Sequence, residues 1–178
     1  MPSASSGGSV NLNLVTGDGW YNIIRIHSGL TTTVTDSFSG PGNKIGDITL
    51  DGSGNLIIAD YEADKFFLMD GISSTVTDSF SSPGSGLKGV AITASGNLVS
   101  CDNGTDKIYV HDGFGATITN SFASPSTGPT GLTVTLDGDL VSCDSSSDKI
   151  YIHDGVSSTI SNSFSSAGSQ PKGVSISG

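Results

Sequence analysis

Short stretches in which apolar and polar residues alternate recur along the whole chain. In the segment GDITL (46–50), Ile48 and Leu50 share one face of an extended backbone, and 89–93 and 131–135 repeat this alternation. The dipeptides DG, SG and NG, which favour tight turns, lie between such stretches. No segment shows the period of an amphipathic helix. The pattern therefore predicts an all-β protein made of short antiparallel strands.

The strand pattern itself repeats at an interval of 42 residues. The segments 54–71, 96–113 and 138–155 align at that shift without a gap, and 13–29 falls in the same register. Each copy reads as four short strands, of which the last is TVTDSF or a close variant. Antiparallel four-stranded units with a period of about 40–45 residues are typical of β-propeller blades. We therefore predict a β-propeller of four 42-residue blades.

The register of the repeats divides the chain into a tail and one domain. Residues 1–10 are expected to form a flexible tail, and 11–178 a single β-propeller domain. The predicted blades are 11–43 plus 171–178, 44–86, 87–128 and 129–170. The first blade begins at its second strand, and the C-terminal PKGVSISG matches the first strand of the other copies.

This arrangement predicts that the C-terminal strand closes the ring. Pairing of 171–178 beside 13–17 would place the two ends of the chain in one sheet and remove an exposed edge. A monomer is then the expected state. The alternative is a dimer in which two chains exchange this strand and form an eight-bladed ring.

One blade carries a resemblance to a known family. The run from Gly89 to Val110, with G-N-L-V-S-x-D followed by D-K-I-Y-V, resembles blades of the NHL and SMP-30-like propellers. The resemblance covers about 168 of the 178 residues and implies a fold, not a chemistry. Propellers of this group usually have six or more blades. SMP-30-like lactonases hold a divalent ion on the propeller axis with a Glu, Asn and Asp set, and the innermost strands here offer only Asp47 for such a role.

Composition excludes several classes of partner. The net charge of −10, with a sequence pI of about 4.2, repels the phosphate backbone of nucleic acids and anionic lipid surfaces. The sequence shows no signal peptide and no run of about 18 apolar residues that could span a membrane. The compartment stays open, because two free thiols suit a reducing cytosol and a Ser/Thr-rich acidic surface suits an extracellular setting.

Residues that repeat in every blade are expected to serve the fold. A carboxylate at the end of each second strand can accept turn N–H groups and pair with the Lys five residues on. The repeated turn residues are Asp18, Asp60, Asp102, Asp144, Lys65, Lys107 and Lys149. A divalent cation such as Ca²⁺ is the alternative role for these carboxylates. Three equivalent histidines, at 27, 111 and 153, are expected to pack and to bond in turns beside Asp112 and Asp154.

Residues that break the repeat are the better candidates for function. The loops after the second strands carry Trp20 and Tyr21 in blade one and Tyr61 in blade two, where blades three and four have small polar residues. Aromatic rings on this face suit stacking on a sugar or burial in a partner protein. Their structural alternative is to cover the seam where the ring closes. Asp47 is a further candidate ligand-binding residue.

These observations predict a non-catalytic binding or interaction module for a glycan or a protein. The alternatives are a lactonase- or lyase-like metal-dependent enzyme that uses Asp47, and a purely structural repeat unit. No catalytic residue, metal site or cofactor is assigned. The sequence carries no G-x-S-x-G elbow, P-loop or H-E-x-x-H motif.

Overall fold

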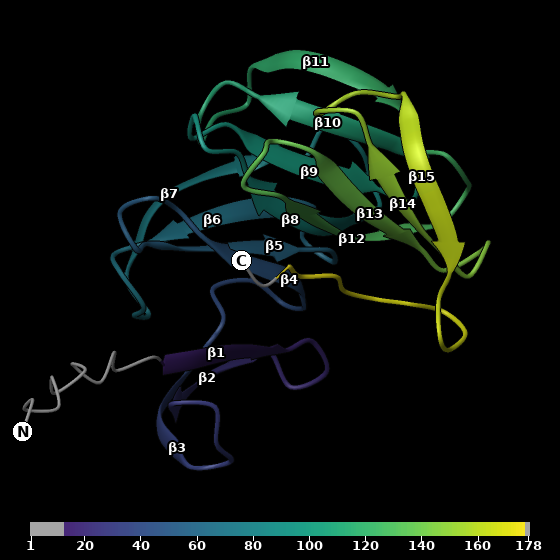
Figure 1. Ribbon diagram of the computed structural model, residues 1–178. Helices are drawn as coiled ribbons and strands as arrows, with labels where there is room; N and C mark the ends of the chain where they lie inside the picture. The colour runs from purple at the N-terminus through teal and green to yellow at the C-terminus, as the bar shows by residue number, and fades with distance from the viewer. Residues whose placement is uncertain (1–12, 177–178) are drawn as a thin grey trace, which may run out of the picture.

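The computed structural model describes residues 13–176, which form fifteen strands and no helix (Figure 1). The strands are β1 (Asn13–Asp18), β2 (Ile23–Ser28), β3 (Val34–Ser39), β4 (Ile45–Leu50), β5 (Leu56–Asp60), β6 (Lys65–Met69), β7 (Val76–Ser81), β8 (Leu87–Ile92), β9 (Leu98–Asp102), β10 (Lys107–His111), β11 (Ile118–Ala123), β12 (Pro129–Val134), β13 (Leu140–Asp144), β14 (Lys149–His153) and β15 (Ile160–Ser165). The predicted tail at 1–10 lies outside the described residues.

The strands form four antiparallel sheets in the blade arrangement of a β-propeller, which confirms the predicted fold class. Three sheets have four strands, in the orders β4-β5-β6-β7, β8-β9-β10-β11 and β12-β13-β14-β15. Figure 1 shows the blades following one another in chain order, from the purple β1–β3 sheet to the green and yellow β12–β15 sheet. Within residues 13–176 there is no helix that could cross a lipid bilayer.

The hairpins between second and third strands explain the repeated dipeptide Asp-Lys at 64–65, 106–107 and 148–149. Asn22, Asp64, Asp106 and Asp148 occupy equivalent positions and all have φ between 48° and 54°. Asn and Asp are the non-glycine residues that best tolerate this left-handed conformation. The chain therefore turns at this residue and enters the third strand at the next one.

The hydrophobic core lies between neighbouring blades. Ile57 and Phe66 of one blade pack with Leu87 and Val90 of the next, and all four are buried. Equivalent clusters join the first blade to the second and the third to the fourth. A four-stranded sheet has two apolar faces, so each blade is stabilised by burying them against its neighbours.

The predicted ring closure is not formed among the described residues. The first blade is a three-stranded sheet, β1-β2-β3, and Pro171–Ile176 belong to no strand. This C-terminal segment lies instead against the fourth blade, where Thr130 Oγ1 donates a hydrogen bond of 2.6 Å to the Pro171 carbonyl. The segment thus takes the place of the next innermost strand after β12, but it does not pair with β1. The expectation of a C-terminal strand beside 13–17 is corrected on this point.

Candidate functional site

A hydrogen-bonding unit that repeats between blades organises one face of the propeller, at the ends of the second strands. The Asp102 carboxylate is buried and accepts hydrogen bonds from Thr105 N and from Gly86 N, at 2.7 and 2.9 Å. In return, Gly86 O accepts from Asn103 N at 2.8 Å. The loop that enters the blade is thereby tied to the turn that follows the second strand. We name this unit the loop clamp.

The loop clamp is made in three blades. Asp60 binds Lys44 N at 2.6 Å, and Asp144 binds Gly128 N at 2.8 Å; both carboxylates also accept N–H groups from the turn that follows. Turn and loop N–H groups lower the pKa of Asp144, against the opposing effect of burial. The Asp residues therefore work as acceptors for backbone N–H groups.

The predicted pairing of these Asp residues with the Lys five positions on is wrong. Asp60, Asp102 and Asp144 are at most 1% exposed, whereas the side chains of the lysines extend into solvent. Across residues 13–176 the one salt bridge is Arg25–Asp18, at 3.3 Å. The carboxylates turn toward backbone donors inside the blade, and a solvated ammonium loses nothing by staying outside. Lys65, Lys107 and Lys149 are exposed residues at the starts of the third strands.

Asp18 holds its turn in the same way but has a different second partner. Its Oδ1 accepts hydrogen bonds from Trp20 N and Tyr21 N, both at 3.0 Å. Its Oδ2 faces Arg25 instead of an incoming loop. The bond from Tyr21 N is the main cause that lowers the pKa of Asp18. The loop that carries Trp20 and Tyr21 is thus ordered by Asp18.

Two of the predicted aromatic residues meet around a pair of lysines. Lys44 Nζ lies 5.2 Å from the centre of the Trp20 ring and 5.0 Å from that of Tyr61, and Lys88 Nζ lies 3.9 Å from the Tyr61 ring. These are cation–π distances. The Tyr61 side chain, as a hydrogen-bonding partner, also raises the pKa of Lys44 above its ordinary value, which is consistent with an ammonium held beside the rings. We call Trp20, Lys44, Tyr61 and Lys88 the aromatic–lysine cluster.

The cluster is accessible to a ligand. Trp20 is 80% exposed, and the other three members are half-buried. Tyr21 is 69% exposed, but it joins none of these cation–π contacts. The structure therefore brings Trp20 and Tyr61 together and leaves Tyr21 beside them.

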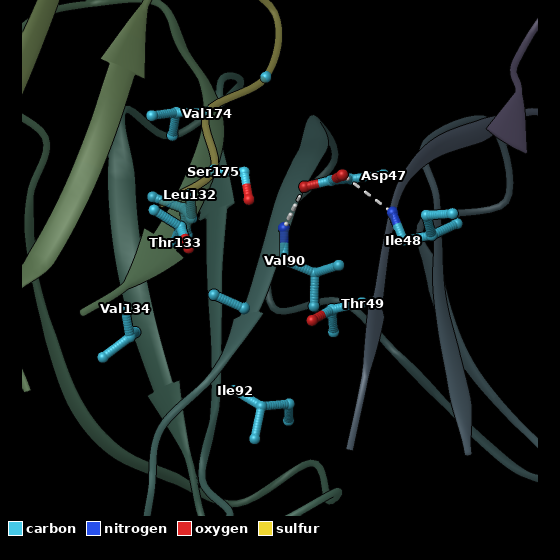
Figure 2. Close-up of a pocket in the computed structure, with 12 residues that line it drawn as sticks. Asp47, Ile48, Thr49, Val90, Ile92, Leu132, Thr133, Val134, Val174 and Ser175 are labelled. Carbon is cyan, nitrogen blue, oxygen red and sulfur yellow. Dashed lines mark hydrogen bonds between the residues drawn. The ribbon is translucent and has the colours of Figure 1, made fainter. Parts of the chain in front are cut away.

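Asp47 occupies a separate place, in a pocket of about 590 Å³ among the innermost strands (Figure 2). The pocket is lined by one stretch from each of the strands β4, β8 and β12 and by Gly173–Ser175. Asp47 stands where the other innermost strands have glycine, at 89, 131 and 173. Figure 2 shows its carboxylate accepting hydrogen bonds from Val90 N and Ile48 N, both 2.9 Å. Desolvation raises the pKa of Asp47 to about 7.

The pocket and the cluster are distinct. None of Trp20, Tyr21 and Tyr61 lines the pocket, so the four predicted ligand-binding residues do not form one site. In the part of the chain that the structure describes, no three His, Cys, Asp or Glu side chains gather as a metal site would require. Asp47 is the one ionisable side chain among the lining residues.

His111, His153, Cys101 and Cys143 are buried in the blades, whereas His27 is half-buried and its Nε2 lies 3.0 Å from Thr16 Oγ1. His111 Nε2 lies 3.0 Å from Ser100 Oγ and its Nδ1 lies 3.0 Å from Gly115 O; His153 repeats both contacts with Ser142 and Ser157. Their partners are therefore a strand serine and a turn carbonyl, not the neighbouring Asp112 and Asp154. Burial raises the pKa values of the free thiols of Cys101 and Cys143.

Sequence reasoning missed the two lysines of the cluster. Lys44 comes from the connection between the first two blades, and Lys88 lies in β8. In the repeat, Gly86, Gly128 and Gln170 correspond to Lys44, and Gly46, Thr130 and Lys172 correspond to Lys88. The same test that selected Trp20 and Tyr61, departure from the repeat, could have selected Lys44.

Comparisons with known proteins support the fold. No family model matches the chain, and no curated protein matches its sequence. A catalytically inactive variant of virginiamycin B lyase from Staphylococcus aureus, solved with quinupristin, matches with a TM-score of 0.66 and 16% identity over 93% of this chain and 56% of its own. The WD40 β-propeller domain of Doa1 matches with a TM-score of 0.63 and 15% identity over 78% of this chain and 46% of its own.

A third solved structure, a protein of unknown function from Bacteroides caccae, matches with a TM-score of 0.63 and 12% identity over 90% of this chain and 60% of its own. The chain thus spans about half the length of the structures it matches. At these identities the likeness establishes a β-propeller fold. The neighbours include both an enzyme and a WD40 domain, so the fold is compatible with catalysis and with binding.

Proposed function

We propose that the protein is a non-catalytic binding module whose ligand, a glycan that carries carboxylate or sulfate groups, binds at the aromatic–lysine cluster. The observation that carries the proposal is that Lys44 Nζ lies within cation–π distance of both aromatic rings, 5.2 Å from the centre of Trp20 and 5.0 Å from that of Tyr61. An exposed indole offers a flat apolar surface on which a sugar ring can stack. The two ammonium groups offer partners for acidic substituents of the same sugar.

The charge of the whole molecule supports this assignment. The chain carries −10 overall and only seven basic residues, and two of its six lysines are in this cluster. A local positive site on an acidic protein favours a ligand with separated acidic groups over a polyanion such as nucleic acid, which the remaining surface repels. A protein partner that presents acidic side chains is the alternative ligand, as the same chemistry would recognise it.

Trp20 gives a direct signal for the test, because it is the one tryptophan of the chain. Titration with polygalacturonate oligomers and heparin oligosaccharides should change its fluorescence, whereas neutral dextran oligomers should not. Calorimetry should show at least a tenfold loss of affinity for Trp20→Ala and for Lys44→Ala. Lys107→Ala, which removes an exposed lysine from another blade, is the matched control and should bind as the unchanged protein does.

Absence of binding to all acidic probes, or equal losses for Lys44→Ala and Lys107→Ala, would reject the proposal. A large loss of stability in Trp20→Ala without any binding phenotype would assign the ring to the seam beside the first blade.

The pocket around Asp47 supports a second candidate function, a hydrolase or lyase, in which Asp47 is the one ionisable lining residue. A single carboxyl group with a pKa of about 7 is suited to proton transfer near neutral pH. Calorimetric titration with Ca²⁺, Mg²⁺ and Zn²⁺ tests the metal-dependent form of this candidate. Uptake that disappears in Asp47→Asn would support it, and no heat of binding for any of the three would exclude it.

A further inference from the structure

Among the residues that the structure describes, the sheet of the first blade has no innermost strand, while a segment of matching sequence lies outside any sheet. Pro171–Ile176 correspond in the repeat to the first strands of the other blades. One side of this segment is docked: a Cβ atom added to Gly131 would lie 2.8 Å from Gly173 Cα. The other side is open, because a Cβ atom on Gly173 would meet nothing within 4 Å. Among residues 13–176, the segment therefore packs on one neighbouring blade and belongs to no sheet.

The inner edge of β1 is the place where an innermost strand would pair in a complete blade. Leu14 corresponds in the repeat to Leu56, Leu98 and Leu140, which are at most 1% exposed, yet Leu14 itself is 37% exposed. Beside it lies an apolar groove of about 270 Å³, whose lining includes Leu14, Leu30 and Leu50. In the complete blades the innermost strand covers this position. The exposure of Leu14 follows from the absence of that strand.

The first blade also lacks the loop clamp that the other three blades form. The residue that binds the Asp lies 16 positions before it in three blades: Lys44, Gly86 and Gly128. The corresponding residue for the first blade is Gln170, one residue before the C-terminal segment. Here Gln170 N donates instead to Asp148 Oδ1, at 2.6 Å, and Asp18 Oδ2 faces Arg25. The donor and the acceptor of the clamp in the first blade, Gln170 N and the Asp18 carboxylate, are thus both present but not bonded to each other.

We infer that a second copy of the chain supplies this strand. In the proposed dimer, Pro171–Ile176 of each copy pair with β1 of the other, and Gln170 N binds Asp18 across the interface. Eight blades then form one ring with two such junctions, in which each four-stranded first blade contains strands from both copies.

Two observations favour a second copy over closure within one chain. Each of the two elements is already packed on its own neighbour, the segment on the fourth blade and β1–β2 on the second blade, and this packing leaves them unpaired. In addition, the four blades superpose on 46–60% of the larger propellers that they match, with TM-scores of 0.63–0.66. Their arrangement is thus that of part of a wider ring, which a second copy can complete.

The repeat fixes the register of the exchanged strand. β12 pairs with β13 so that Gly131 faces Cys143 and Val134 faces Leu140. Transferred to the first blade, this register places Gly173 opposite Gly17 and Ile176 opposite Leu14. Directly opposed side chains in an antiparallel pair have Cβ atoms about 4.5–5.5 Å apart, within reach of a short cross-linker.

Cross-linking of Leu14→Cys/Ile176→Cys with a short bismaleimide tests the pairing, and native mass measurement of the unchanged chain at 0.15 M salt tests the assembly. The inference predicts a mass of twice 17.9 kDa and a covalent dimer from the double variant. Leu14→Cys and Ile176→Cys alone should give no covalent dimer. The unchanged chain, whose two thiols are fully buried, controls for reaction at Cys101 and Cys143.

A cross-link within one chain, recognised by a monomer mass, would show closure in the single chain and overturn the inference. A monomer mass for the unchanged chain at 50 μM would overturn it as well, whether or not the double variant folds. Because the test reads mass and not ligand binding, its result is independent of the glycan proposal.

Discussion

Asp144 and Gly128 lie 16 residues apart and are joined by a hydrogen bond of 2.8 Å, from the Gly128 N–H to the buried carboxylate. The same relationship holds in two other blades, so one side chain per blade fixes both the incoming loop and the following turn. This bond connects the repeat of the sequence to the face on which the aromatic–lysine cluster lies.

Loss of one loop clamp should lower stability strongly. Asp102→Ala leaves Gly86 N and Thr105 N without their acceptor in a buried place, and hydrogen bonds to a charged group contribute about 1.5–3 kcal/mol each. We expect the free energy of unfolding in urea to fall by about 3 kcal/mol. Asp112→Ala, which removes an exposed Asp of the same blade, should change it by less than about 0.5 kcal/mol. Equal effects of the two substitutions would contradict the role of the clamp.

Replacement of Gly89 should destabilise the protein, because the backbones of neighbouring innermost strands are in close contact there. A Cβ atom at Gly89 would lie 2.9 Å from Cys101 Sγ and 3.0 Å from Gly131 Cα. Gly89→Ala is therefore expected to cost about 1–3 kcal/mol through overpacking, measured by thermal unfolding. Gly52→Ala, at a turn where an added Cβ meets nothing within 4 Å, is the control. A melting temperature for Gly89→Ala equal to that of the control would show that the blades can separate without cost.

The raised pKa of Asp47 should make stability fall as pH rises. Between pH 3.8 and about 7 the folded protein keeps a proton on Asp47 that the unfolded chain has released, so increasing pH favours unfolding. Asp47→Asn removes this contribution. The stability of the variant relative to the unchanged protein should therefore improve by roughly 2–4 kcal/mol between pH 4 and pH 8.

His111 and His153, whose pKa values are lowered by burial, also make stability depend on pH. Both are present in each protein, so their contributions cancel. A stability difference that stays constant from pH 4 to pH 8 would mean that Asp47 is ionised in the folded state throughout.

His111 should show the opposite dependence. Burial lowers its pKa, so the folded protein holds it neutral below pH 6.5, where the unfolded chain would bind a proton. Its contribution is complete above pH 6.5 and decreases as pH falls through the lowered value. The stability lost in His111→Gln should accordingly be larger at pH 7.5 than at pH 5, and NMR titration should place the imidazole pKa below 6.5. A larger loss at pH 5 would reverse the assignment.

Most of the fold could be predicted because the four copies of the repeat align with one another and so identify equivalent positions. The spacing of Ile57, Val99 and Val141 predicted equivalent buried strands, and these residues are 0–6% exposed. The closing strand could not be predicted in the same way. The sequence shows that Gly173 is equivalent to Gly131. Whether its segment can reach β1 of the same chain depends on the angle between neighbouring blades. That angle is set by the packing between all four blades, which the repeat does not reveal.

The candidate site was predicted in part, for a related reason. Trp20 and Tyr61 stood out because the repeat has small residues at their positions, and the structure brings both to Lys44. Asp60 and Lys65 are opposed across the β5–β6 hairpin, but their side chains form no ion pair, because the Asp60 carboxylate binds backbone N–H groups instead. The donors to Asp60 are the backbone N–H groups of Lys44, Glu62 and Ala63. Backbone donors are present in almost every residue, so side-chain identity could not reveal them.

The loop clamp also makes each blade structurally self-contained, because its donor and acceptor lie within one repeat. A segment of 42 residues beginning at Gly86 contains its own Asp, its own donor and a complete four-stranded sheet, so it can be duplicated or deleted without breaking a bond inside another blade. Growth of such a chain by gene duplication would then change the size of the ring in whole steps, and the same property offers a way to engineer assemblies of chosen diameter.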